Sequence, residues 1–157
     1  MAAGTPATAL LSREKISHTL HPYDHDPRAD GYGEEAAAAL GVAPQRLFKT
    51  LIASIDGRLV CAVVPVAGRL DLKALAAIAG GKRAGMAGAA AAQRATGYVV
   101  GGISPLGQKT RLPVVVDASA QALPTVYVSA GKRGLQVELA PDDLVRLTSG
   151  KFGRIAT

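Results

Sequence analysis

Hydrophobic and polar residues follow their clearest pattern in the middle of the chain, between residues 47 and 64. The runs Leu47–Ile55 and Arg58–Val64 are rich in β-branched and other apolar residues, and Asp56-Gly57 separates them. Asp-Gly between two such runs is a strong signal of a two-residue hairpin turn, because both central residues of that turn need a positive φ. The pattern predicts a β-hairpin.

Helical patterns and further strand candidates surround this hairpin. Helix starts are indicated by a capping side chain, a first-turn proline or acids near the positive end of the helix dipole. The expected helices cover residues 6–15, 34–40, 71–79 and 87–95, with a final one from 141; the other expected strands cover 16–23, 98–100, 114–116, 125–128 and 135–139. Strands that come partly as hairpins and partly after helices predict a mixed sheet with helices outside it, an α+β fold.

Length and composition bound the class of protein. A chain of 157 residues with 48% hydrophobic residues fits one domain over 1–157 and excludes wholesale disorder. Aromatic residues make up only 4%, which argues against reading single strands by stacking bases. The single Cys61 provides no disulfide framework, and no apolar stretch approaches the ~20 residues of a membrane span. We therefore expect a cytoplasmic protein with no membrane partner.

The net charge of +6 is concentrated in one segment. Residues 69–111 carry seven Lys and Arg against one acid, and so supply the whole excess. Such a segment is typical of a protein that binds a polyanion, although a solvated basic face without a partner fits the charge equally well.

Two motifs could hold an anion or a developing negative charge. Gly101–Gly107 is a Gly-rich run after an expected strand, and it is either an ordinary bend or a loop whose backbone N–H groups face a ligand. It is not a phosphate-binding P-loop, since Gln108 stands where that motif needs Lys. Lys49 lies in an apolar strand, so its ammonium either reaches the solvent at an edge or lies in a cleft.

Metal and nucleophile chemistry find less support. His18 and His21 would lie on opposite faces of a strand, and no second ligand pair follows them, so we expect no metal and no cofactor. Cys61 lies in an apolar run that would raise its pKa, and we expect it to fill the core. No Ser, His and Asp arrangement has the spacing of a nucleophile elbow.

Several strings, taken together and in order, resemble the YbaK family of aminoacyl-tRNA editing proteins. They span nearly the whole chain: Thr5-Pro6-Ala7, Tyr23-Asp24-His25-Asp26-Pro27, Phe48-Lys49-Thr50-Leu51, Pro65-Val66-Ala67-Gly68-Arg69-Leu70-Asp71, residues 92–108, and residues 128–135. The branch that they resemble removes Cys from proline tRNA.

The resemblance implies a trans-acting aminoacyl-tRNA deacylase for Cys-tRNA(Pro), with prolyl-tRNA synthetase as a partner and no DNA. It implies a mixed, largely antiparallel sheet curled into a partly closed barrel with flanking helices. Catalytic roles fall on Lys49, Gly101 and Gly102, and substrate contacts on Tyr23, Tyr32, Thr50, Ile103, Ser104, Ser129 and Gly131. The thiol of the substrate cysteine would attack its own ester carbonyl, so the protein needs no nucleophile. Gln136 departs from the acid usual in this branch.

Two other functions remain open from the sequence. One is a non-catalytic module of the same fold that delivers tRNA to a synthetase. The other is a deacylase of the same fold for Ala-tRNA(Pro) or another aminoacyl ester. Turnover of differently charged tRNAs separates all three.

Overall fold

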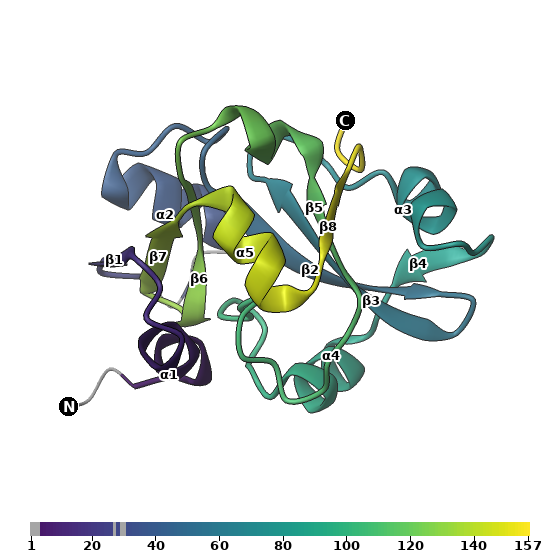
Figure 1. The fold of residues 1–157 in the computed structure, drawn as a ribbon, viewed down its shortest axis with the longest axis horizontal. Coiled ribbons are helices and arrows are strands. Elements are labelled where there is room, and N and C mark those ends of the chain that lie inside the picture. Colours follow the sequence, from purple (N-terminus) through teal and green to yellow (C-terminus); the bar gives the residue numbers. More distant parts are fainter. Residues whose placement is uncertain (1–3, 27, 29–30) are drawn as a thin grey trace.

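The computed structural model describes residues 4–26, 28 and 31–157 of the chain. Its helices and strands follow one another in this order (Figure 1): α1 (Pro6–Arg13), β1 (His18–Pro22), α2 (Tyr32–Leu40), β2 (Phe48–Ile55), β3 (Arg58–Pro65), α3 (Leu72–Ile78), β4 (Ala84–Met86), α4 (Ala89–Thr96), β5 (Val114–Asp117), a 3₁₀ turn (Ala118–Ala122), β6 (Val126–Lys132), β7 (Leu135–Leu139), α5 (Pro141–Thr148) and β8 (Lys151–Gly153).

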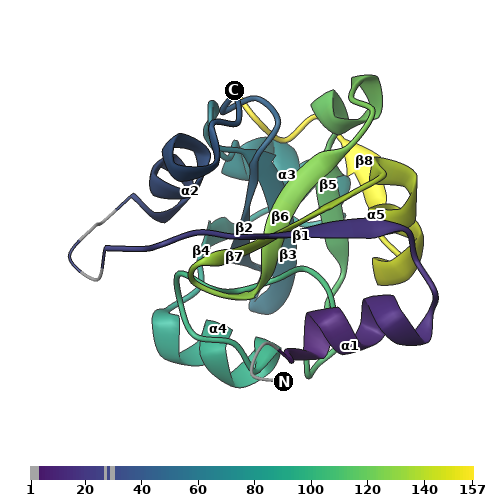
Figure 2. The ribbon, with the colours of Figure 1, turned by 90° about the vertical axis from the view of Figure 1, so that its left-hand side faces the viewer.

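The strands form two sheets. β1, β7 and β6 make an antiparallel sheet of three strands, and the order β4-β2-β3-β5-β8 makes a mixed sheet of five. β2 pairs antiparallel with β3 and β4, whereas β5 runs parallel to β3 and β8. Figure 2 shows the smaller sheet from the outside, with α1 and α2 at its borders. The α+β class expected from the sequence is confirmed.

The expected partly closed barrel is not confirmed, because neither sheet closes on itself in the described residues. In the described part of the chain, one isolated parallel bridge between Leu47 and Tyr127 joins the two sheets. Beyond that bridge β2 and β6 part, and the pairing of β6 with β7 shifts register between Ser129 and Lys132. The separation leaves an open edge on β2 instead of a continuous ladder.

Three apolar clusters hold these layers together. The largest lies between the two sheets, where Phe48 and Ile52 of β2 pack with Val128 and Val137 of the smaller sheet. A second covers the other face of the five-stranded sheet, where α3 packs through Leu75. A third lies beneath α2, where Ala36 and Ala37 pack with Leu47, Val66 and Tyr127 at the border between the two sheets. Since successive residues of a strand face opposite sides, β2 contributes its even positions to the first cluster and its odd positions to the second.

Local signals account for most element boundaries. The hairpin forms as expected, with positive φ at both Asp56 (50°) and Gly57 (82°). The side chain of Asp71 caps α3 by accepting a hydrogen bond from the N–H of Ala74. Gly41 ends α2 in the left-handed conformation, and Pro141 begins α5.

The expected strand at 98–100 is wrong. Tyr98 is buried in the largest apolar cluster, where its hydroxyl donates a hydrogen bond to the carbonyl of Leu106, and the chain turns here instead of pairing as a strand. Two short strands that the pattern did not predict, β4 and β8, complete the edges of the larger sheet.

Candidate active site

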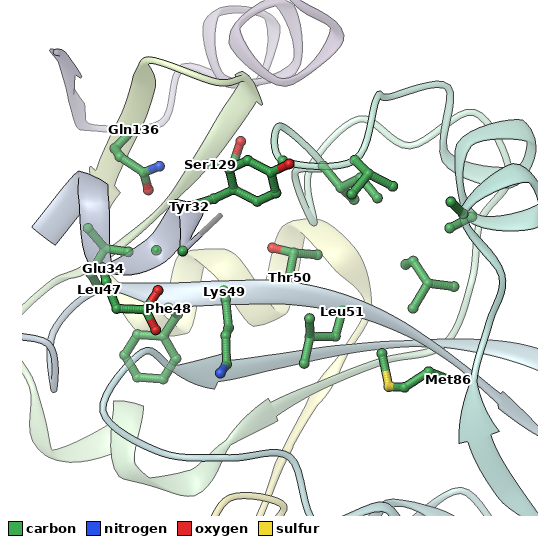
Figure 3. Close-up of a pocket in the computed structure, with 18 of the residues that line it drawn as sticks. Tyr32, Glu34, Leu47, Phe48, Lys49, Thr50, Leu51, Met86, Ser129 and Gln136 are labelled. Carbon is green, nitrogen blue, oxygen red and sulfur yellow. The ribbon is translucent and has the colours of Figure 1, made fainter. Parts of the chain in front are cut away.

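A cavity of about 520 Å³ opens along β2 where the two sheets part (Figure 3). The rest of its wall comes from the segment after β1, the start of α2, the end of β4, α4 and the loop after it, and the strands β6 and β7. Its polar lining consists of Tyr23, Tyr32, Glu34, Lys49, Thr50, Ser129 and Gln136. Sequence elements more than 100 residues apart thus meet around one space.

Lys49 and Thr50 direct their side chains to opposite sides of β2. Figure 3 shows the Thr50 hydroxyl on the same side as Ser129 and Gln136, and the Lys49 ammonium on the other. Lys49 is half-buried and forms no hydrogen bond or ion pair with any residue that the structure describes. An ammonium without a partner in the lining of the cavity is available to an anionic ligand. This is the second of the two positions considered from the sequence, in which the ammonium lies in a cleft.

Two buried polar atoms on the other side of the strand also lack partners. Thr50 Oγ1 and Gln136 Oε1 are shielded from solvent and form no hydrogen bond within the described chain. A buried polar group left unpaired costs about 1–3 kcal/mol, so proteins rarely keep one without a purpose. Both atoms line the cavity, and a ligand with hydrogen-bond donors would satisfy them.

The ring of Tyr32 links α2 to the Gly-rich loop. Tyr32 is the first residue of α2, and the guanidinium of Arg133 lies 4.3 Å from the centre of its ring. Arg133 also forms an ion pair with Glu35 at 3.3 Å. A Cβ atom placed on Gly101 would come within 3.3 Å of two ring carbons of Tyr32. The tyrosine is therefore held from two directions at the mouth of the cavity.

The cavity brings together seven of the ten site residues expected from the sequence. Lys49, Gly101, Tyr23, Tyr32, Thr50, Ile103 and Ser129 line it. Gly102, Ser104 and Gly131 do not. Their proposed contact with substrate stays a prediction.

Each of these three residues has a packing role in the fold. The N–H of Gly102 donates to the carbonyl of Val99 at 2.9 Å, and a Cβ on Gly102 would lie 2.7 Å from Lys132 Cα. Ser104 is fully buried and accepts from the N–H of Leu106. Gly131 has a φ of +110° and lies against Tyr98.

Gln136, Glu34, Met86 and Val100 line the cavity although the sequence did not place them in the site. For Gln136, its departure from the acid usual in the family was the one available signal. For Glu34, the sequence indicated only an acidic residue in the first turn of a helix. Met86 and Val100 are exposed apolar residues, which a hydrophobicity pattern assigns to a core.

The cavity wall provides no activated nucleophile among the described residues. Cys61 does not line it, and burial raises the pKa of its thiol to about 12, so it carries almost no thiolate near neutral pH. Among the described residues of the lining there is no histidine or cysteine, and Ser129 Oγ accepts a hydrogen bond from the N–H of Gly131. The described residues contain no group of three His, Cys, Asp or Glu that could hold a metal ion. No helix in the described ranges is long and apolar enough to cross a membrane.

The fold of this chain is shared with proteins of known structure. It matches the crystal structure of a proposed trans-editing enzyme for prolyl-tRNA synthetase with a TM-score of 0.84 and 22% identity, over 99% of both chains. It also matches the crystal structure of a hypothetical protein with a TM-score of 0.86 and 26% identity, over 98% of this chain and all of that one. The chain shares the fold of these two proteins.

Sequence comparison identifies the family. A profile of the aminoacyl-tRNA editing domain matches residues 26–147. A proposed Cys-tRNA(Pro)/Cys-tRNA(Cys) deacylase of Enterococcus faecalis, EbsC, is 41% identical over 126 residues, which cover 79% of this chain and 76% of EbsC. The chain belongs to the aminoacyl-tRNA editing domain family. It is an aminoacyl-tRNA deacylase, an enzyme that hydrolyses the ester between an amino acid and its tRNA.

Proposed function

We propose that this chain hydrolyses Cys esterified to proline tRNA, and that the thiol of the substrate performs the attack. The observation that carries the proposal is the inventory of the cavity. Within the described chain, the ammonium of Lys49 and buried polar atoms of Thr50 and Gln136 in its lining have no partner, and the described lining holds no thiol and no imidazole. The similarity to EbsC supports cysteine as the amino acid.

The chemistry needs no group from the enzyme as nucleophile. The cysteine thiol loses its proton to solvent, and its sulfur attacks the ester carbonyl carbon of the same residue. A C–S bond forms, the carbonyl electron pair moves to oxygen, and the tetrahedral intermediate then expels the ribose oxygen, which takes a proton from water. Water opens the resulting thiolactone to free cysteine.

The protein contributes position and charge. Holding thiol and carbonyl in a reactive geometry raises the rate because a bound substrate has already lost its freedom of orientation. The ammonium of Lys49 has no partner in the described chain, so it can hold a phosphate of the tRNA acceptor end beside the ester. The basic segment 69–111 provides further cations for the tRNA backbone.

A panel of purified tRNA(Pro) charged with Cys, Ala or Pro tests the proposal. The account predicts rapid release of Cys and far slower release of Ala and Pro. Faster release of Ala than of Cys would replace cysteine by alanine as the substrate. Binding of all three tRNAs without release would instead make the chain a delivery module. Prolyl-tRNA synthetase, the proposed protein partner, is added in a parallel series, where we expect it to supply the mischarged tRNA.

A further inference from the structure

β2 has an open backbone edge inside the cavity. One edge of this strand pairs with β3 along its whole length, from Phe48 to Ile55. The other edge pairs with β4 only from Ala53 to Ile55, and it meets β6 only at the bridge of Leu47. The stretch between these two contacts faces the space that the cavity occupies.

The pairing pattern fixes which backbone groups use the open edge. In an antiparallel pair, positions alternate between those that exchange hydrogen bonds and those whose N–H and C=O point away. The N–H of Val66 donates to the carbonyl of Leu47 at 2.8 Å, so the odd positions of β2 bond to β3. The even positions, including Thr50 opposite Val63, therefore direct both backbone groups to the opposite edge.

Two hydrogen bonds, one at each end of the stretch, support this assignment. The carbonyl of Ile52 accepts from the N–H of Ala87 at 3.0 Å, and the carbonyl of Arg46 accepts from the N–H of Tyr127 at 3.0 Å. Both acceptors are even positions that use the edge away from β3. Thr50 lies between them, and no residue in the described part of the chain pairs with its N–H.

The remaining groups of Thr50 face the same space. Its side chain lines the cavity, and its hydroxyl oxygen is buried without a partner. By contrast, the N–H of Gly102 in the Gly-rich loop is already used by the carbonyl of Val99. Thr50 thus presents an unpaired backbone N–H to the cavity. The Gly-rich loop, by contrast, has fewer free N–H groups than the sequence led us to expect.

We propose that the backbone N–H of Thr50 is the donor that stabilises the oxyanion of the tetrahedral intermediate. This inference rests on the proposed ester hydrolysis and adds the group that receives its negative charge. When sulfur attacks the carbonyl carbon, the C=O electron pair moves to oxygen, and the Thr50 N–H donates a hydrogen bond to that oxygen. A donor fixed by a β-strand needs no reorganisation as the charge develops, which is the condition for an effective oxyanion contact.

The strand geometry also orients the substrate. The C=O of Thr50 leaves the same edge as its N–H, so it can accept a hydrogen bond from the α-amino group of the bound aminoacyl ester. An extended ligand that pairs with a strand edge through both groups is held in one register. The ester carbonyl would then lie over the N–H in every productive complex.

Thr50→Pro removes the N–H and leaves the ladder to β3 intact. Proline is tolerated at edge positions whose N–H does not serve the sheet, and Lys49 before it is already in the extended conformation that proline requires. Thr50→Val is the matched control, because it keeps the N–H and the branched shape and removes only the hydroxyl. We expect Thr50→Pro to lower kcat for Cys-tRNA(Pro) about 10²–10³-fold, the usual effect of one oxyanion donor. Thr50→Val should lower it less than tenfold.

A second measurement keeps the inference testable if Thr50→Pro fails to fold. In the ¹⁵N-labelled parent chain, the amide of Thr50 should exchange with solvent faster than that of Leu51, which bonds to β3. The probe is the amide analogue of 3′-cysteinyl adenosine, which is not hydrolysed. We expect it to shift the Thr50 amide resonance and slow its exchange, with little change at Leu51.

The two measurements separate this inference from the proposed function. A parent chain without activity on Cys-tRNA(Pro) would overturn the substrate, whereas a shifted Thr50 amide would still support the oxyanion donor for an aminoacyl ester. A slowly exchanging Thr50 amide that ignores the analogue, or a folded Thr50→Pro variant with the parent's kcat, would overturn the inference itself.

Discussion

The ring of Tyr32 lies directly against the backbone of Gly101. A Cβ atom on Gly101 would approach two ring carbons to 3.3 Å, and the φ of this residue is +96°. L side chains rarely adopt such a φ, and forcing one to do so costs about 1–3 kcal/mol. The contact connects the Gly-rich loop to the mouth of the cavity. A side chain added at Gly101 would therefore displace the Tyr32 ring, which lines the cavity.

Gly101→Ala should therefore reduce turnover more than it reduces stability. We expect the free energy of unfolding to fall by about 1–3 kcal/mol, and kcat/KM for Cys-tRNA(Pro) to fall at least tenfold, because the ring must move. Gly85→Ala is the matched control, since a Cβ there meets nothing within 4 Å. Denaturant unfolding and deacylation of the two variants decide the point. An unstable Gly101→Ala variant that keeps the parent's kcat/KM would make the loop purely structural.

Lys49→Ala should lower deacylation at least tenfold and leave the fold intact. The loss of one charge-assisted contact to a phosphate costs about 1.5–3 kcal/mol. Lys49 has no partner among the described residues, so removing its side chain breaks no ion pair of the fold. Arg154→Ala serves as the control, because that arginine is exposed, lies outside the basic segment 69–111 and does not line the cavity. Equal kcat/KM in Lys49→Ala and the parent would remove Lys49 from the site.

Gln136→Met should separate stability from activity. The variant replaces a buried side chain, whose Oε1 lacks a partner in the described chain, by an apolar one of similar length. Without an unpaired acceptor to bury, the folded state should be at least as stable as in the parent. Turnover should fall, because a hydrogen-bond acceptor of the cavity is gone. Gln121→Met, at an exposed position, should change neither quantity. Full activity of Gln136→Met would show that its amide does not contact the substrate.

Binding to tRNA should weaken steeply with salt if the basic segment contacts phosphates. The backbone N–H groups of Lys82 and Arg83 donate to the Asp56 carboxylate, which fixes this loop while both side chains stay exposed. Each neutralised phosphate contributes about 0.7–0.9 to the slope of log K against log salt. Changing both residues to Ala should lower that slope, whereas Arg13→Ala, outside the segment, should not. A flat salt response of the parent would contradict the electrostatic contribution to binding.

The sequence was most informative where a local signal acts alone. The Asp56-Gly57 hairpin and the helix starts near Asp71 and Pro141 form as expected, because turn and helix-start chemistry involves only neighbouring residues. β4 escaped prediction because Ala84-Gly85-Met86 has no β-branched residue, and only its pairing with β2 makes it a strand. The 98–100 strand failed because Tyr98 reaches the core from a turn.

In the candidate site, too, local motifs could be recognised from the sequence, whereas features set by tertiary packing could not. The resemblance placed Lys49 and Thr50 in it through the motif Phe48-Lys49-Thr50-Leu51, and both line the cavity from opposite sides of β2. Gly102 and Ser104 were expected there because the resemblance matches them to a Gly-rich loop beside the substrate carbonyl, and their contact with substrate stays a prediction. Their burial against the turn at Lys132 and beneath Leu106 depends on tertiary packing that no local pattern encodes. The open edge at Thr50 depends on where β4 and β6 stop, and is equally invisible in the sequence.

The proposed catalysis depends on the thiol of the substrate cysteine acting as the nucleophile. Cys61 is fully buried, and burial raises the pKa of its thiol to about 12, so this cysteine carries almost no thiolate near neutral pH. An unperturbed thiol has a pKa of ~8.5 and supplies some thiolate at that pH, whereas a hydroxyl supplies almost none. A substrate without a thiol should therefore react slowly even when it binds well.

The most direct test compares tRNA(Pro) charged with Cys, Ser or Ala, under single-turnover conditions, in the parent and in Cys61→Ala. The account predicts rapid release of Cys by both proteins, far slower release of Ser and Ala, and a thiolactone that can be trapped from the Cys reaction. Comparable rates on all three tRNAs, or loss of activity in a folded Cys61→Ala variant, would contradict attack by the substrate thiol.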